Sequence, residues 1–371
     1  CKDSVNGLHV TLRYSVFEDN DAVIRSVSCS NRGDRTLYLE KVLSACLDMD
    51  CGDWDTLTLH GSWAREHIMN RRELTLGKYM AASARGESGH QVQPFLAVLD
   101  RNADQESGEV YGMHFVYSGN FMAAAEKTQF GALRMVMGIH PEGFEWVMKP
   151  GESFDAPEVV CVYSDGGLGK MTRTFHNLYR NHLIRSPYLH QKRPILINNW
   201  EATYFDFNTE KLLQIASEAK KRGIEMLVMD DGWFGKRSSD ECYLGDWSVN
   251  EEKLPGGLKY LADRLNDMGM KFGIWFEPEM ISPDSDLYRK HPEWTVQHPG
   301  REITQSRAQY ILDLSRPEVV DYVYESVASI IRSANIFPEA VCGKNIILNT
   351  TDIILGKNIL SFSHSFSSSF S

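Results

Sequence analysis

Glu225–Trp233 reads Glu-Met-Leu-Val-Met-Asp-Asp-Gly-Trp, an apolar run that stops at two carboxylates, a glycine and an indole. Its apolar residues do not alternate with polar ones, which is typical of a strand buried on both faces, as parallel strands covered by helices are. Asp230 and Asp231 follow at the carboxyl end of this predicted strand. In parallel α/β folds, ligand sites are built where strands end and the next loops begin. The stretch therefore predicts a parallel α/β sheet with a site at its edge.

Two other stretches repeat this arrangement. Ile195–Glu201 ends in a tryptophan and a glutamate, and Lys271–Glu279 ends in a tryptophan and two glutamates. Amphipathic helical patterns follow, the first of them capped by Asn208 or Thr209. Strands that alternate with helices indicate a parallel sheet.

The region before these units has a different pattern. Short β-rich runs separated by polar turns predict a large antiparallel β domain over residues 1–165. We expect a connecting helix and linker over 166–193 and a partial α/β barrel over 194–336. Residues 337–371 end in a serine-phenylalanine run and are predicted to be a disordered, low-complexity tail. The predicted β-domain strands are Val10–Tyr14, Val23–Cys29, Phe95–Leu99, Val110–Tyr117 and Leu133–Ile139.

Composition excludes several classes of partner. The 371 residues carry 39 basic and 50 acidic side chains and a formal charge of −11, which opposes the phosphate neutralisation that nucleic-acid binding needs. No apolar run approaches the roughly 20 residues of a membrane span. The seven cysteines form no Cys-x-x-Cys pair, which indicates a reducing, cytoplasmic setting. No cofactor or metal is predicted, because the strand ends carry neither histidines nor glycine-rich basic loops.

The mixture of tryptophans and carboxylates at the strand ends suits carbohydrate. Indoles pack against the C–H faces of sugar rings, and carboxylates accept hydrogen bonds from sugar hydroxyls. Asp230 and Asp231 are unlikely partners in glycoside hydrolysis, because retention needs carboxyl groups about 5–5.5 Å apart on opposite sides of one bond, and neighbours on a strand face opposite ways. We expect them to bind hydroxyls instead. Either Glu277 or Glu279 is a candidate for catalysis or for a structural carboxylate.

One tryptophan in the β domain also stands out, because Trp63 is followed closely by Arg65 and Glu66. From these residues alone, a core tryptophan beside a surface ion pair is favoured over a functional one.

Several motifs together resemble the α-galactosidases of glycoside hydrolase family 36. Those in the barrel region are Ile197–Ala202, Met229–Gly235, Gly245–Trp247, Lys271–Met280 and Leu312–Pro317, and those before it are Leu59–Glu66 and Phe175–Arg180. The resemblance implies a β-supersandwich followed by a catalytic (β/α)8 barrel of the TIM type, of which only the first three to four βα units are present. It also implies retaining hydrolysis of terminal α-galactosyl residues from galactosides such as melibiose and raffinose, commonly by homotetramers.

The resemblance also assigns residues to the substrate site. It implies galactose contacts from Trp200, Asp230, Asp231, Trp275 and Arg307. It further implies that Trp63 lines the pocket of a neighbouring subunit, which reverses the interpretation drawn from its local sequence.

The catalytic aspartates of that family have no counterpart here. The nucleophile belongs to a Lys-Trp-Asp-Met-Asn strand expected directly after Asn335–Ile336, where Phe337–Ala340 stands instead, and the acid/base belongs to a later strand. We therefore expect this chain to be inactive, with its first residues clipped and residues 337–371 read from another frame or an unspliced segment. The alternatives are a non-catalytic galactoside-binding remnant and an α-N-acetylgalactosaminidase.

Overall fold

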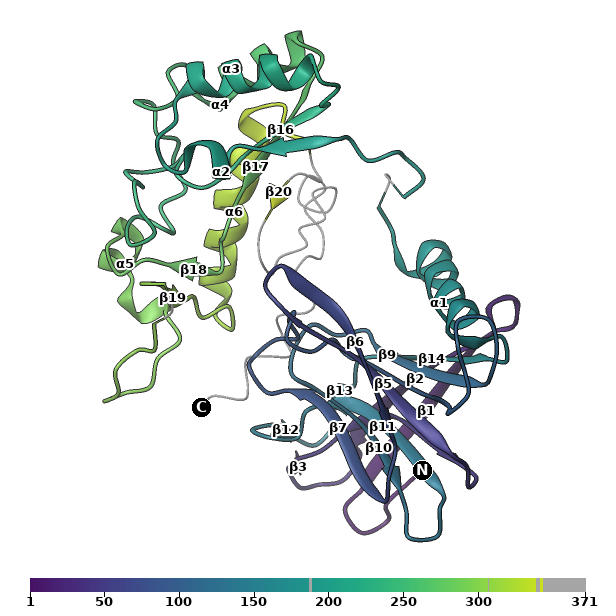
Figure 1. Cartoon of the computed structure of the whole chain (residues 1–371). Coiled ribbons are helices and arrows are strands. Elements are labelled where there is room, and N and C mark those ends of the chain that lie inside the picture. Colours follow the sequence, from purple (N-terminus) through teal and green to yellow (C-terminus); the bar gives the residue numbers. More distant parts are fainter. Residues whose placement is uncertain (187–188, 306, 338–340, 343–371) are drawn as a thin grey trace. The chain divides into compact units, whose positions relative to one another are not determined.

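The structure is a computed structural model that describes residues 1–186, 189–305, 307–337 and 341–342. Along the sequence, the described chain divides into two compact units between Leu189 and His190. The first unit is drawn in purple to teal and the second in teal to yellow (Figure 1). The serine-rich stretch Ser361–Ser371 and most of the predicted tail lie outside the described residues.

A large antiparallel sheet is the frame of the first unit. Its strands lie in the order β1, β2, β14, β9, β8, β5, β6, and β13 also pairs with β2. Their bounds are β1 Leu8–Phe17, β2 Ala22–Asn31, β5 Trp54–Ser62, β6 Arg65–Glu73, β8 Phe95–Asp100, β9 Val110–Phe115, β13 Ser153–Asp155 and β14 Val159–Ser164. A short 3-10 turn, η1 Glu18–Asn20, joins the first two strands. The predicted antiparallel strands of this region are confirmed.

A second layer packs against one face of this sheet. It contains a three-stranded sheet in the order β10, β11, β4 and a two-stranded pair of β12 and β3, with β7 alongside β10. Their bounds are β3 Leu37–Leu39, β4 Leu43–Met49, β7 Gly77–Ser83, β10 Phe121–Lys127, β11 Leu133–Ile139 and β12 Trp146–Met148. Leu96 and Val98 of β8 share a core with Phe121 and Met135 of this layer. The two layers therefore form a sandwich.

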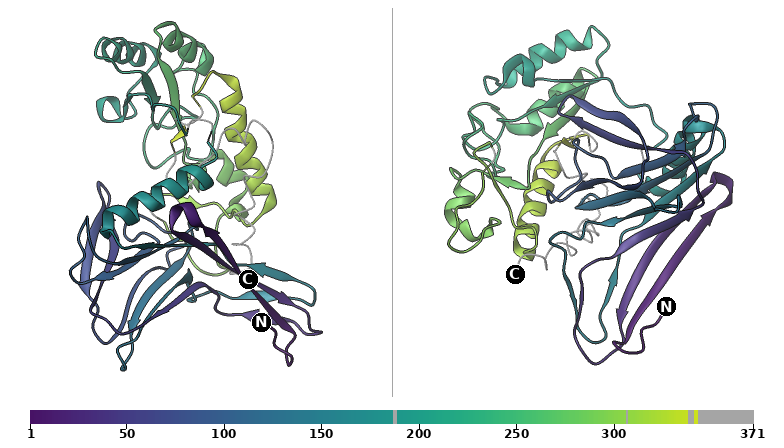
Figure 2. Two further views of the ribbon diagram at one scale, coloured as in Figure 1. Left: turned by 90° about the vertical axis from the view of Figure 1, so that its right-hand side faces the viewer. Right: turned by 60° about the horizontal axis from the view of Figure 1, so that its bottom comes forward.

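Helix α1 covers the opposite face of the large sheet (Figure 2). It spans Gly167–Leu178 and continues as a π-helical turn, η2 Tyr179–Leu183. Side chains alternate along a strand, so the β8 residues that alternate with Leu96 and Val98 point away from the sandwich core. They pack against helix α1. Gly112 allows the close approach, since a Cβ there would lie 2.8 Å from both Met171 Sδ and Phe175 Cε2.

A parallel sheet is the centre of the second unit. Strands β15 Leu196–Asn198, β16 Met226–Met229 and β17 Lys271–Trp275 lie side by side, with Asn198 opposite Val228 and Met229 opposite Ile274. All four residues of β16 are buried, as its unbroken apolar sequence predicted.

Helices follow these strands, as the alternating pattern predicted. The side chain of Asn208 caps α3 by accepting a hydrogen bond from the Lys211 backbone N–H, which decides between the two candidate caps. The helices and short turns are α2 Trp200–Thr203, α3 Thr209–Lys220, α4 Gly257–Asp267, α5 Asp286–Lys290, η3 Pro292–Trp294 and α6 Pro317–Ser333. A separate antiparallel pair joins β18 Met280–Ile281 to β19 Tyr310–Ile311.

One short strand lies within the segment that was predicted to be a disordered tail. β20 Val341–Cys342 lies in the predicted tail and extends the sheet by pairing in parallel with β17. The segment predicted to be a disordered tail therefore contains a strand at these two residues. A two-residue strand is too short to produce a periodic pattern, and its pairing partner is distant in sequence.

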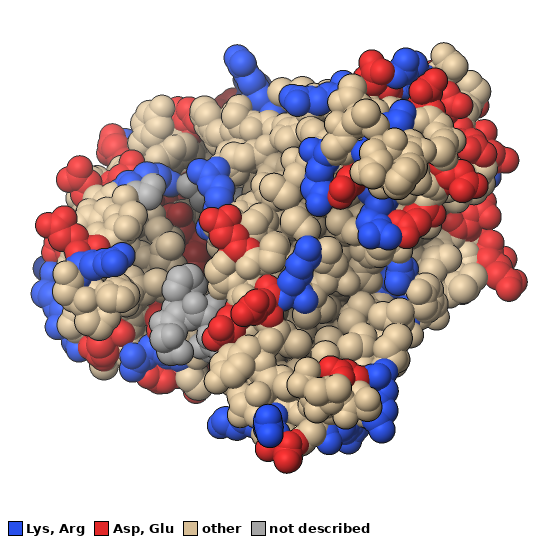
Figure 3. Space-filling view, turned by 90° about the horizontal axis from the view of Figure 1, so that it is seen from below, with Lys and Arg blue, Asp and Glu red and all other residues tan. Residues whose placement is uncertain are grey.

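The described residues also bear on membrane insertion and on the distribution of surface charge. None of the helices described is both long and apolar enough to cross a membrane. On the face drawn in Figure 3, lysine and arginine side chains are dispersed among acidic ones.

A partly buried histidine makes the first unit sensitive to acid. His114 Nδ1 lies 2.6 Å from the Tyr179 hydroxyl, which joins β9 to the end of α1. Burial lowers the pKa of His114 to about 4. The unfolded chain therefore binds this proton at higher pH than the folded chain does. The resulting stability is complete above about pH 6.5 and is lost as the pH falls toward 4.

We expect this histidine to remove about 2 kcal/mol of stability between pH 7 and pH 5. Urea unfolding of the full chain at the two pH values should show a smaller acid loss in His114→Gln than in the wild type. His176→Gln is the control, because that imidazole is exposed on α1. An equal acid loss in His114→Gln and in the wild type would contradict the assignment.

Candidate functional site

The carboxyl ends of three parallel strands bring the predicted barrel residues to one edge of the sheet. Trp200 comes two residues after β15, Asp230 comes directly after β16, and Trp275 is the last residue of β17. Because the register aligns these ends, segments that are distant in sequence become neighbours. All three side chains are partly buried, so each keeps some surface open to a ligand.

An asparagine pair after β15 holds Asp230 in place. Asn198 Nδ2 donates to Asp230 Oδ2 at 2.6 Å, and the Asp230 backbone N–H donates to Asn199 Oδ1 at 2.8 Å. Asn198 Oδ1 also accepts from the backbone N–H of Trp200 at 2.7 Å. No role was predicted for these asparagines from the sequence. Two adjacent amides at a strand end were the available signal.

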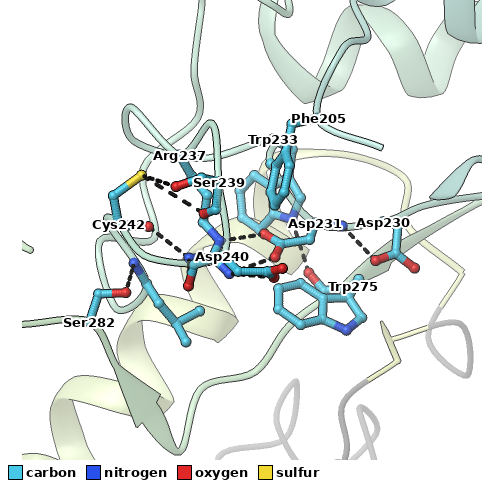
Figure 4. Close-up of polar contacts among 12 residues, drawn as sticks. Phe205, Asp230, Asp231, Trp233, Arg237, Ser239, Asp240, Cys242, Trp275 and Ser282 are labelled. Atoms are coloured by element: carbon cyan, nitrogen blue, oxygen red, sulfur yellow. Dashed lines mark hydrogen bonds and ion pairs between the residues drawn. The ribbon is translucent and has the colours of Figure 1, made fainter. Parts of the chain in front are cut away.

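Asp231 points the other way, into a buried ion pair (Figure 4). Arg237 Nε and Nη2 donate to its two carboxylate oxygens, each at 2.7 Å. Asp231 is 3% exposed and Arg237 is 0% exposed, so the pair is shielded from solvent. Burial raises the pKa of Asp231, and the hydrogen bonds and charge of Arg237 counteract part of that rise. In this arrangement, the sugar hydroxyl that Asp231 is predicted to bind must donate to a carboxylate lone pair that Arg237 does not use.

The tryptophans near the strand ends divide into two kinds. Trp233, which the sequence analysis grouped with the aromatic residues of the site, is wholly buried and packs against Phe234, Trp247 and Phe276. Its indole N–H donates to the Trp275 carbonyl at 2.9 Å. Trp233 therefore supports the strand end, because a wholly buried indole has no face to offer a sugar.

Two glutamates after β17 are also buried. Glu277 is 3% exposed and Glu279 is 8% exposed. Neither presents an open carboxylate at the strand ends in this conformation. The choice between a catalytic and a structural role for them stays a prediction.

Arg307 and Trp63 complete the predicted set. Arg307 is exposed and its Nη2 lies 3.0 Å from Asp240 Oδ1. Trp63 belongs to the first unit, in the turn between β5 and β6, where it is 83% exposed. The core position favoured by its local sequence is therefore wrong.

Lys253 joins the loops that follow two of the strands. Its ammonium donates to the carbonyls of Phe205, Gly232 and Arg237 at 2.9, 3.0 and 3.2 Å. Burial lowers the pKa of Lys253, while Asp231 and Asp206 counteract this. Sequence reasoning missed both Lys253 and Arg237, because one basic residue in a polar loop has no distinguishing pattern. Across the described residues, no group of three or more His, Cys, Asp or Glu is placed to hold a metal ion.

Comparison with known families assigns both units of the chain. The family model described as the glycosyl hydrolase family 36 N-terminal domain matches residues 1–149, and that described as Melibiase matches residues 153–338. The chain belongs to glycoside hydrolase family 36. This confirms the resemblance of its motifs.

Curated relatives of this family 36 chain are α-galactosidases. The chain is 50% identical over 334 residues to α-galactosidase AgaA of Geobacillus stearothermophilus, covering 90% of this chain and 46% of that enzyme. It is 44% identical over 335 residues to an α-galactosidase of Lactobacillus acidophilus, with 90% and 46% covered. The chain thus spans about half the length of these curated relatives.

Solved structures confirm the fold class. The crystal structure of AgaA has a TM-score of 0.89 to this family 36 chain at 50% identity, covering 90% of this chain and 47% of that one. Crystal structures of AgaA variants are also known in complex with stachyose and with raffinose. A β-rich N-terminal domain followed by part of the catalytic domain is the shared architecture.

The Lys253 contacts predict a local stabilising role. Lys253→Met should remove three hydrogen bonds to partly buried carbonyls and lower the free energy of unfolding by about 1–3 kcal/mol. Urea denaturation of the full chain measures this loss. Lys259→Met is the matched control, because Lys259 is an exposed lysine that pairs with Asp263. Equal stability of the two variants would refute the role.

Proposed function

We propose that this chain binds the terminal α-galactosyl residue of oligosaccharides such as melibiose and raffinose, at the carboxyl ends of β15, β16 and β17. The observation that carries the proposal is one partly open carboxylate, Asp230, between two partly open indoles, Trp200 and Trp275. The stachyose and raffinose complexes of AgaA, a relative with 50% identity, support the substrate class.

The chemistry of each group suits this ligand. An indole face packs against the C–H face of a sugar ring, and a carboxylate accepts hydrogen bonds from adjacent hydroxyls. Asn198 already donates to Asp230 Oδ2, which orients the carboxylate and leaves lone pairs for the ligand. Asp231 and Arg307 are proposed as further contacts, the first from within its ion pair with Arg237 and the second from an exposed position.

Trp63 is proposed as a contact between subunits of a homotetramer. Its indole is 83% exposed at the turn between β5 and β6, where it is available to another chain. A cytoplasmic location is proposed because the cysteines described in both units are free thiols, which suits a reducing compartment.

For the whole protein we propose retaining hydrolysis of α-galactosides. That reaction needs two carboxyl groups about 5–5.5 Å apart, one as nucleophile and one as acid/base. The Melibiase match ends at residue 338, and no Lys-Trp-Asp stretch stands in the 371 residues. We therefore propose that these residues by themselves bind but do not hydrolyse the substrate.

Binding tests the first part of this proposal. Galactose titrated calorimetrically into the full, monodisperse chain should bind, and Asp230→Asn should weaken binding about tenfold or more, because a charge-assisted hydrogen bond is lost. Trp275→Ala should also weaken it. Asp263→Asn, an exposed aspartate on α4, is the control. Absence of binding by the folded wild type would reject the proposed site.

Turnover tests the second part. We expect no release of aryl alcohol when the purified chain is incubated with an aryl α-galactoside, while AgaA hydrolyses the same substrate in a parallel assay. Robust hydrolysis by these 371 residues alone would show that other carboxylates catalyse the reaction. Binding without turnover is the expected result.

A further inference from the structure

Arg237 is a charged group near the strand ends to which the proposed function gives no role. Its guanidinium is wholly buried and donates to both oxygens of Asp231. Nη1 also donates to the Cys242 carbonyl at 2.7 Å. The ring centroids of Phe205 and Phe234 each lie 5.8 Å from its guanidinium carbon. One side chain thus connects the end of β16 with the loop that follows it.

Asp240 connects this buried pair with an exposed arginine. Its Oδ1 lies 4.0 Å from Arg237 Nη2 and 3.0 Å from Arg307 Nη2. The four side chains therefore form a row of alternating charge that runs from Asp231 through Arg237 and Asp240 to Arg307. We call this row the ion-pair row of the site. It begins at a buried strand end and finishes at a proposed sugar contact.

The backbone at the exposed end of the ion-pair row is unusual. Arg307 and Ala308 have φ values of 55° and 54°, in the left-handed region that residues other than glycine rarely adopt. Such a conformation persists when surrounding contacts oppose its relaxation. The ion pair with Asp240 gives the Arg307 side chain a defined direction at this point of the chain.

We propose that Arg237 is a positioning residue for the proposed galactoside site. It fixes the Asp231 carboxylate directly and fixes Arg307 through Asp240. A bidentate guanidinium defines both the position and the plane of its carboxylate partner, which a single ammonium does not. This inference rests on the proposed function for its ligand but not for its geometry.

The experiment compares variants of the full chain. Arg237→Gln removes the charge. Arg237→Lys keeps the charge but loses the two-pronged guanidinium, and Asp240→Asn removes the charge in the middle of the ion-pair row. The double variant Asp231→Asn with Arg237→Gln replaces the buried ion pair with two amides, which avoids a lone buried charge if Arg237→Gln alone fails to fold. Arg289→Gln is the matched control, because Arg289 also pairs with two aspartates but is exposed.

Calorimetry with galactose gives the first readout. We expect the dissociation constant to rise at least tenfold in Arg237→Gln and less in Arg237→Lys. The double variant serves the ligand-independent readout, because Asp231→Asn by itself alters a proposed sugar contact. Combining Arg237→Gln with Arg307→Gln should cost less than the sum of the separate losses, because both act on one contact. The control should bind like the wild type. A folded Arg237→Gln with unchanged affinity would overturn the proposal.

A ligand-independent readout separates this inference from the proposed function. In the labelled full chain, the side-chain Nε–H resonance of Arg307 is identified by its disappearance in Arg307→Gln. We expect it to shift in Asp240→Asn and in Arg237→Gln or the double variant, and to stay unchanged in Arg289→Gln. If the wild type does not bind galactose, the proposed function fails, and this resonance still decides. An unchanged resonance in Arg237→Gln or the double variant overturns the positioning role.

Discussion

The buried ion pair between Asp231 and Arg237 is the interaction on which the arrangement of the strand ends depends. Both charges are removed from water, so each is tolerated only because the other is present in bidentate geometry. Removing one partner of such a pair typically costs about 3–5 kcal/mol. The loop after β16 is thereby held against its own strand. Lys253 extends this effect, since its ammonium holds carbonyls of two successive loops.

Strand geometry separates the roles of the two adjacent aspartates. Successive side chains of a strand point to opposite sides, so one carboxylate at the end of β16 meets Arg237 and the other meets Asn198. Asp230 remains partly open and Asp231 is enclosed. The same dipeptide thus supplies a group that a ligand can reach and a group that anchors the loop. That the pair does not act as two catalytic carboxyls stays a prediction.

The sequence predicted the elements of the fold well where patterns are local. The unbroken apolar run of β16, the Asn208 cap of α3 and five strands of the β domain (β1, β2, β8, β9 and β11) follow from periodicity and short-range hydrogen bonding. Prediction failed for β20, which is two residues long and is defined by its pairing with β17. It also could not find Arg237, because an arginine in a polar loop is ordinarily exposed.

The sequence by itself determined the family, the order of strands and helices, and the set of strand-end residues, because these depend on motifs and on local periodicity. Only the tertiary structure decided which indoles are enclosed and which are open. Trp233 and Trp275 both lie at strand ends, yet Trp233 is wholly buried among Phe234, Trp247 and Phe276. Burial and ion pairing depend on which distant segments meet, and that information is absent from any short stretch of the chain.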